Sequence, residues 1–371
     1  MSETATATPP VTGTDTSNPK DHKRQQTDAE GEDEPNNTPS QAAKKQRTDT
    51  PANTEEEAEP QQQQQQQQET ARDKDKQNND AAASPRSAEI EIEADAAEDK
   101  GSRHSMEDAW VVLPDATLED FPANLRCAHF AIYDGHGGRL AAEYAQKHLH
   151  RNVILAGLPR ELLDVKVAKK AILDGFRKTD ESILQESASG GWQDGATAVC
   201  VWVLGQKVFI ANIGDAKAVL ARSPAADGLQ THTDEVSPLK AIVLTREHKA
   251  IYPHERARVL KAGGTIGANG RLQGRLEVSR AFGDRQFKKV GVSSIPDIHS
   301  FDLTDREHFI ILGCDGLWGV FGPSDAVEFV QKLLKEGLTA TALSRRLVRE
   351  AVRERRCKDN CTAIVIVFRQ K

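Results

Sequence analysis

The chain has 371 residues and a formal net charge of −7, and the acidic excess of residues 1–87 accounts for that charge. The remainder is near neutral, so neither part offers the basic surface that captures RNA or DNA, and we expect no direct nucleic-acid partner. The chain has no apolar signal segment and no run of ~18 apolar residues. We therefore expect no membrane partner and a cytoplasmic and/or nuclear protein that is not secreted.

Residues 1–87 are predicted to form a disordered, low-complexity polar tail. They contain no Phe, Trp or Tyr, and residues 61–68 are a run of glutamine. Such a segment cannot bury enough apolar surface to offset the entropy of ordering its backbone. Residues 88–371 then form a single domain, because their length is within the usual range for one mixed α/β unit.

Strand patterns begin at Ala88, where Ile90, Ile92 and Ala94 alternate with glutamates. A period of two predicts a strand with one buried face. Further apolar or β-branched runs predict strands at 126–133, 197–204, 207–213, 216–221, 241–244, 308–312 and 361–368. The short glycine-containing connections at 205–206 and 214–215 predict antiparallel hairpins.

Helical periodicity occurs between these strands. Apolar residues share a face after Leu140, at 167–176, at 326–334 and from about 340 to 355. Pro323 and Gly337 mark the start and the stop of the third pattern. Because strands outnumber helices and pair locally, the sequence predicts the α+β class, with helices covering antiparallel sheet.

The five cysteines are odd in number, which argues against a disulfide framework. Several lie in apolar runs, where cysteine behaves as a small hydrophobic residue, and this usage fits a reducing compartment. Cys357 and Cys361 have the loose spacing of a metal or redox pair, but no second pair and no C-x-x-C accompany them. We interpret these cysteines as structural.

Carboxylates recur at the ends of the predicted strands. Asp134 and Asp315 each close an apolar run and precede a glycine, and Asp359 stands just before the last run. Three further carboxylates have comparable positions: Glu107, Asp108 and Asp215. One Asp before Gly is commonly a turn former, but five or six such positions favour a metal site at one sheet edge. Oxygen ligands without a matching His or Cys set indicate hard ions, Mg²⁺ or Mn²⁺.

Seven motifs together resemble, in order, those of the metal-dependent type 2C serine/threonine protein phosphatases. They are RHSMED (103–108), DGHGG (134–138), DGATAV (194–199), ANIGDAKAVL (211–220), LEVSRAFGD (276–284), CDGLW (314–318) and DNCTAIVI (359–366). Each alone is unspecific, but seven in order span the region from about Ala88 to the C-terminus. The chain most resembles the plant members and the integrin-linked-kinase-associated branch.

The resemblance implies an antiparallel β-sandwich of two sheets flanked by helices, a four-layer αββα fold with a two-metal centre at one edge. It implies that Asp134 bridges both metals, that the Gly135 carbonyl binds one of them, and that Asp315 and Asp359 hold the other. A carbonyl ligand needs a backbone free to approach the ion, which suits glycine.

The resemblance also implies hydrolysis of phosphoserine and phosphothreonine in proteins, without a phosphoenzyme. A water held between two cations attacks phosphorus, and Glu107 and Asp108 match residues that position such waters. Arg103 would grip the phosphate with its bidentate fork. His136 would protonate the departing oxygen, since imidazole titrates near the working pH. The partners would be phosphoprotein substrates, with a monomer favoured and the oligomeric state open.

Two departures from the family pattern stand out. Gly319 replaces the last aspartate of DGLWD, which in the family holds a third, weaker metal together with the residue matching Asp215, so a third ion is in doubt. Ala196 stands where Ser or Thr is frequent, a matter of packing.

Two rival hypotheses remain. The first is an inactive relative acting as a phosphoprotein scaffold, and the second is a two-metal nuclease, which the near-neutral charge disfavours.

Overall fold

The computed structural model describes residues 90–118, 123–224 and 238–370. The predicted tail, residues 1–87, lies outside the described residues. No helix in the described ranges is long and apolar enough to cross a membrane.

Two five-stranded antiparallel sheets form the centre of the structure. The order of the first is β1-β13-β12-β8-β9 and that of the second is β11-β7-β6-β3-β2. The first contains β1 (Ile90–Asp99), β8 (Lys217–Arg222), β9 (Lys240–Val243), β12 (Glu307–Gly313) and β13 (Cys361–Gln370). The second contains β2 (Ala109–Leu113), β3 (Cys127–Tyr133), β6 (Ala198–Leu204), β7 (Lys207–Ile213) and β11 (Asp297–Asp302).

The inner strands are apolar throughout because both of their faces are buried. Every residue of β3 and β6 is buried. On β3, Phe130 and Ile132 pack between the sheets, whereas Ala131 and Tyr133 pack against helices on the opposite face. A strand in this position reads as a continuous apolar run rather than an alternating one.

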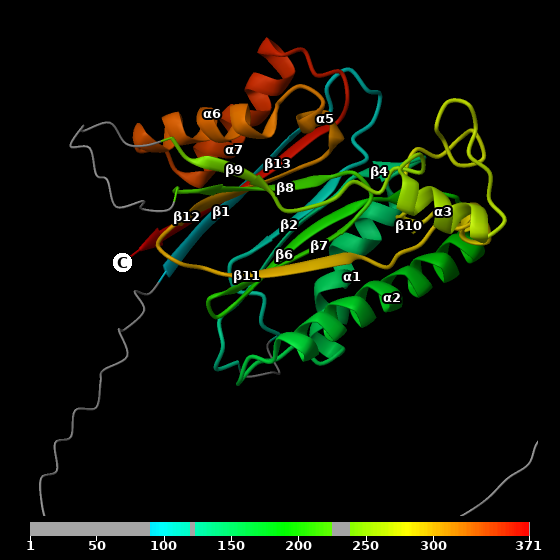
Figure 1. The fold of residues 1–371 in the computed structure, drawn as a ribbon, viewed down its shortest axis with the longest axis horizontal. Helices are drawn as coiled ribbons and strands as arrows, with labels where there is room; N and C mark the ends of the chain where they lie inside the picture. The colour runs from blue at the N-terminus through cyan, green and yellow to red at the C-terminus, as the bar shows by residue number, and fades with distance from the viewer. Residues whose placement is uncertain (1–89, 119–122, 225–237, 371) are drawn as a thin grey trace, which may run out of the picture. The chain divides into compact units, whose positions relative to one another are not determined.

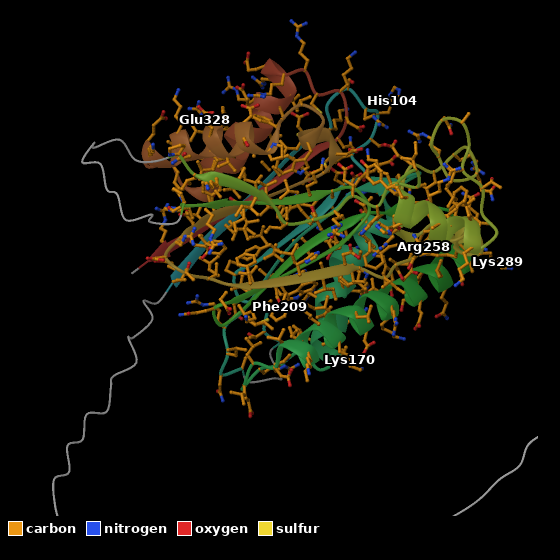
Figure 2. The ribbon with its side chains drawn as sticks, in the orientation of Figure 1. His104, Lys170, Phe209, Arg258, Lys289 and Glu328 are labelled. Atoms are coloured by element: carbon orange, nitrogen blue, oxygen red, sulfur yellow. The ribbon has the colours of Figure 1, made fainter. Side chains whose placement is uncertain are left out.

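Helices cover the outer face of each sheet, which gives the four layers visible in Figure 1. Helices α1 (Leu140–Leu155) and α2 (Val165–Gly190) pack on the second sheet. The first sheet is covered by α5 (Asp315–Trp318), α6 (Pro323–Lys335), α7 (Ala340–Arg349) and the π-helical turn η1 (Glu350–Glu354). In Figure 2, Phe209 marks β7, while Lys170 of α2 and Glu328 of α6 are exposed on the outer layers. The predicted αββα fold is confirmed.

Smaller elements surround one end of the sandwich. A three-stranded sheet joins β10 (Phe282–Gly283), β5 (Gly195–Ala196) and β4 (Gly135–His136). Helices α3 (Pro253–Lys261) and α4 (Arg285–Lys288) belong to a segment with its own apolar cluster around Val259 and Phe287.

Several elements were missed from the sequence, among them β11, α3 and the short β4, β10 and α4. Strand β11 lies at a sheet edge with no fully buried residue, so it lacks an apolar run. Helix α3 buries only Glu255 and Val259, so its sequence PHERARVLK shows little periodicity.

The predicted hairpin at Gly214–Asp215 was wrong, whereas the one at Gly205–Gln206 is confirmed by the pairing of β6 with β7. Strands β7 and β8 belong to different sheets. The connection instead carries the chain from one sheet to the other, with Gly214 at a φ of 90° that favours glycine. A local turn signal cannot distinguish these two outcomes, because the next strand's partner is decided by distant packing.

Candidate metal centre

Three carboxylates from separate parts of the chain meet at one end of the sandwich. Asp134 follows β3, Asp215 lies in the connection between β7 and β8, and Asp315 opens α5 directly after β12. One carboxylate oxygen of each lies within 4.8 Å of those of the other two. The sequence interpretation placed the site at the edge of one sheet. In the structure Asp134 comes from the second sheet and Asp315 from the first, so the centre lies between them.

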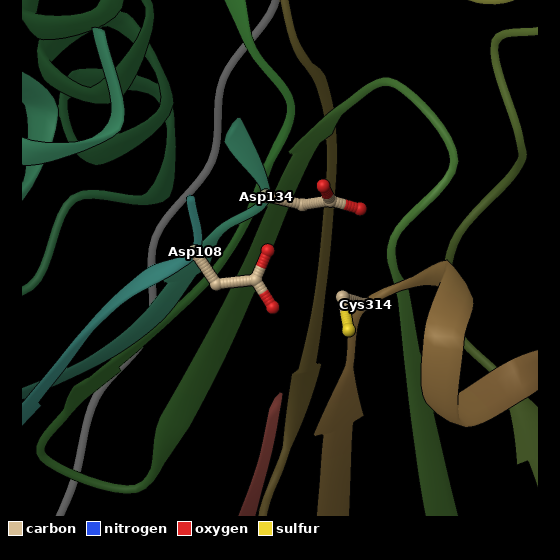
Figure 3. A group of neighbouring side chains, drawn as sticks. All are labelled: Asp108, Asp134 and Cys314. Carbon is tan, nitrogen blue, oxygen red and sulfur yellow. The ribbon is translucent and has the colours of Figure 1, made fainter. Parts of the chain in front are cut away.

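Asp108 forms a second close group with Asp134 and Cys314. Figure 3 shows the carboxylates of Asp108 and Asp134 extending toward Cys314. Thr362 Oγ1 donates a 2.6 Å hydrogen bond to Asp108 Oδ2, and Asp108 Oδ1 is buried without a hydrogen-bond partner among the described residues. Burial raises the pKa of the Cys314 thiol, so it stays protonated. Any ligands for a hard cation in this group are therefore the carboxylates.

The surroundings of the aspartates in this centre disfavour ionisation of their carboxyl groups. Burial, and then the charges of Asp108 and Asp315, raise the pKa of Asp134 well above its ordinary value. Burial and neighbouring carboxylates raise the pKa of Asp315 to about 7 and that of Asp108 to about 6. Asp108 and Asp215 are buried, Asp134 is half-buried and Asp315 is exposed. Carboxylates gathered this closely are stabilised by a cation, and the unpartnered oxygen of Asp108 offers a further acceptor. The residues present therefore fit divalent metal ions.

A cavity of about 550 Å³ opens above the carboxylates. It is lined by all the candidate site residues except Asp108, which lies beneath its floor at 2% exposure. The predicted residues on its wall are Arg103, Glu107, Asp134, Gly135, His136, Asp215, Asp315 and Asp359. The loop of His104, labelled in Figure 2, also contributes to this wall.

Asp359 makes a different contact from the one its predicted role suggests. Its Oδ2 is 2.6 Å from Arg103 Nη2, and it belongs to neither close carboxylate group. The side chains of Arg103 and Asp359 are 61% and 37% exposed, and ion pairs this exposed contribute only about 0–1 kcal/mol. Either partner can therefore exchange at little cost for a phosphate or a cation. Metal binding by Asp359 stays a prediction.

Asn360 holds the loop that carries Arg103 and Glu107. Its Nδ2 donates to the carbonyls of Lys100 and Ser105, at 3.1 and 2.9 Å, and its Oδ1 accepts from Glu107 N at 2.8 Å. The sequence interpretation assigned Asn360 no role, although it directly follows Asp359.

His136 pairs with a residue that was also missed. Its Nε2 lies 2.7 Å from Asp284 Oδ2, and Asp284 is buried. Burial alone would lower the pKa of His136, but the hydrogen bond and charge of Asp284 outweigh it, so the net pKa is raised. A Cβ at Gly195 would lie 2.2 Å from His136 Nε2 and 2.4 Å from Asp284 Oδ2, so glycine is required there. The signal in the sequence was the FGD end of the fifth motif.

Gly135 is required for close backbone packing. A Cβ there would lie 2.3 Å from the carbonyl oxygen of Glu107. The glycine thus lets the strand ends carrying Glu107 and Asp134 approach each other.

Lys249 is a second residue that the sequence did not single out. Its Nζ lies 3.6 Å from Asp215 and 2.9 Å from Glu277. The ammonium group of Lys249 thus lies beside Asp215, and Gly319 has no side chain that could add a metal ligand. A third ion held by Asp215 stays a prediction.

Comparison with known proteins places these features among phosphatases. The family model described as protein phosphatase 2C matches residues 92–361. "Probable protein phosphatase 2C 8" of Arabidopsis thaliana is 78% identical over 277 residues, covering 75% of this chain and 79% of that protein. The human "Integrin-linked kinase-associated serine/threonine phosphatase 2C" is 39% identical over 288 residues, covering 73% and 71%. The solved serine-threonine phosphatase 2C from Toxoplasma gondii superposes with a TM-score of 0.64 at 22% identity, covering 75% and 95%.

Proposed function

The chain belongs to the protein phosphatase 2C family and is a serine/threonine phosphatase, and from this premise we propose that it hydrolyses phosphoserine and phosphothreonine in proteins at a centre for two Mg²⁺ or Mn²⁺ ions. The observation that carries the proposal is the cluster of Asp134, Asp215 and Asp315, whose carboxylate oxygens lie within 4.8 Å of one another on the floor of a cavity. Asp134, Gly135, Asp315 and Asp359 would hold the two ions, with Asp215 available to a third.

Bound there, the cations would supply an activated water for attack on phosphorus and offset the charge that develops on the phosphoryl oxygens. Glu107 and Asp108 would orient waters at the centre through their carboxylate oxygens. Water then attacks directly, and no phosphate is transferred to the protein.

Arg103 and His136 act on the two sides of the reaction. Arg103 reaches the cavity from an exposed position and exchanges its contact with Asp359 for two phosphoryl oxygens. His136, held by Asp284 with its proton retained, protonates the serine or threonine oxygen that leaves.

Phosphate release by the purified full-length chain tests the proposal. We expect release from a phosphothreonine peptide in Mn²⁺ and none after chelation with EDTA. Equal release in EDTA would exclude a metal-dependent reaction, and no release under any metal condition would favour the scaffold hypothesis. Acid-quenched reactions with ³²P-labelled peptide should leave no label on the protein, and labelled protein would exclude direct attack by water.

Replacing Asp284 by Asn should shift the pH dependence of kcat. Loss of the carboxylate removes the contact that raises the pKa of His136, so His136 loses its proton at lower pH. The alkaline limb of the kcat profile should therefore move to lower pH, with a loss of about tenfold or more at pH 8, consistent with typical general-acid contributions. Steady-state kinetics from pH 5.5 to 9 would measure this. A uniform loss with an unchanged profile would show a purely structural role for Asp284.

A further inference from the structure

A second cleft, of about 400 Å³, adjoins the active-site cavity. The two share three wall residues, Arg103, Asp315 and Asp359, so they are continuous beside the carboxylate centre. A group bound in the second cleft would therefore lie next to the phosphoryl group being hydrolysed. We refer to it as the Gly319 cleft, after the glycine on its wall.

Two cations on the wall of the Gly319 cleft, Arg356 and Lys358, have no ion-pair partner among the described residues. Both are exposed. The neighbouring Arg355, by contrast, pairs with Asp325 and Glu350 and stacks on an aromatic ring. Arg356 and Lys358 thus bring two unpaired positive charges to a wall that also carries the carboxylates of Asp315 and Asp359, and Asp359 is already paired with Arg103.

The loop that presents these cations is anchored on both sides. Between them, Cys357 is buried, and its thiol donates to the Gly316 carbonyl at 3.2 Å. Ser102 donates to the Lys358 carbonyl from both its backbone N and its Oγ, at 3.0 and 2.8 Å. Arg356 has a φ of 61°, a left-handed conformation that is uncommon for a side chain of this size. These backbone contacts therefore fix the positions from which the side chains of Arg356 and Lys358 extend.

Gly319 leaves its part of the wall without a side chain. Its φ of −71° is ordinary helical geometry, and a Cβ there would meet only the Asp315 carbonyl at 3.0 Å and the Gly316 carbonyl at 3.9 Å. A carboxylate could therefore be accommodated at this position with a small adjustment. The chain has none, so no carboxylate from this position repels an anion entering the cleft.

We propose that the Gly319 cleft binds an anionic group of the substrate, a carboxylate or a second phosphate close to the phosphorylated residue, through Arg356 and Lys358. The substrate class is then phosphoproteins with acidic or multiply phosphorylated sequences around the target residue. This inference rests on the proposed phosphatase function, because the cleft selects among substrates of that same site.

Three phosphothreonine peptides test the proposal: one with Asp and Glu beside the phosphothreonine, one with Asn and Gln at those positions, and one with a second phosphoserine. We expect kcat/KM of the wild type to favour one or both anionic peptides over the neutral one by about five- to tenfold at low salt. The preference should fall as salt is added, because exposed charges are screened. The two anionic peptides distinguish a carboxylate from a phosphate as the bound group.

The double variant Arg356→Ala/Lys358→Ala should bring the ratio of kcat/KM for the anionic peptides to kcat/KM for the neutral peptide close to one. Gly319→Asp should also lower this ratio. Arg353→Ala is the matched control, because Arg353 is an exposed arginine of the neighbouring turn outside the cleft wall. It should leave the ratio unchanged, and thermal melting checks that each variant is folded.

Two outcomes would overturn the inference. A wild type without a preference, or a double variant that keeps the preference, shows that the cleft does not select the substrate. If the wild type releases phosphate from none of the peptides nor from a small aryl phosphate, the proposed function itself has failed. Turnover of the aryl phosphate, which carries no second anionic group for the Gly319 cleft, thus separates the two failures.

Discussion

Asp134→Ala is expected to lower kcat at least about 100-fold, since even residues that only support metal ligands commonly change affinity or activity 10–100-fold. Asp134 is common to both close groups, one with Asp215 and Asp315 and one with Asp108 and Cys314. Its loss therefore disrupts every candidate arrangement of ligands at once. Phosphate release over a range of Mn²⁺ concentrations would measure the effect.

A readout independent of activity separates metal loss from misfolding. The pKa of Asp134 is raised by burial and by neighbouring carboxylates, so its ionised form opposes folding when no cation is present. The metal-free variant should thus melt no lower than metal-free wild type, while the rise in Tm on adding Mn²⁺ should shrink or vanish. Asp174→Ala, on the surface of α2 beside Lys170, is the control and should retain both activity and the Mn²⁺ shift. Wild-type turnover at low Mn²⁺ in Asp134→Ala would contradict the shared centre.

Asp315→Asn is expected to stabilise the metal-free protein at alkaline pH. The pKa of Asp315 is raised to about 7, so between about pH 4 and pH 7 the folded state binds more protons than the unfolded state. That carboxyl group therefore reduces stability progressively as pH rises through this window. Because Asp315 is an exposed residue, solvent screens much of this effect, so the difference in free energy of unfolding should be only on the order of 1 kcal/mol at pH 8 and disappear towards pH 4.

The wild type must be compared with the Asp315→Asn variant, because the stability contributed by other titratable groups changes with pH in the opposite direction. Burial lowers the pKa of His129 to about 3, so stability from this residue rises with pH up to about 6.5. His129 is present in both proteins and cancels in the difference. Urea unfolding in EDTA at pH 5 and pH 8 would measure that difference. Mn²⁺ should reverse its sign at pH 8, because the ion stabilises only the protein that retains the ligand. An equal difference at both pH values would contradict the expected titration of Asp315.

Most strands of the fold could be predicted because their burial leaves a local record. The runs that form β3, β6, β7 and β13 are apolar because both sides of each strand are covered, and their predicted bounds differ from the observed ones by at most two residues. Strand β11 and helix α3 have exposed faces and left no such record. The failed hairpin at Gly214–Asp215 has a different origin, because a turn shows that the chain reverses but not which sheet the next strand joins.

The sequence by itself determined which chemical groups this protein brings to its site: carboxylates at strand ends, an arginine, a histidine and the glycines between them. These depend on residues only a few positions apart, which motifs record directly. Only the tertiary structure decided which groups touch. His136 and Asp284 are 148 residues apart, and Arg103 and Asp359 are 256 apart, yet each pair lies within 2.7 Å. Contacts of this kind depend on how the two sheets and their loops pack together, and that packing is shared among many side chains rather than carried by any one motif.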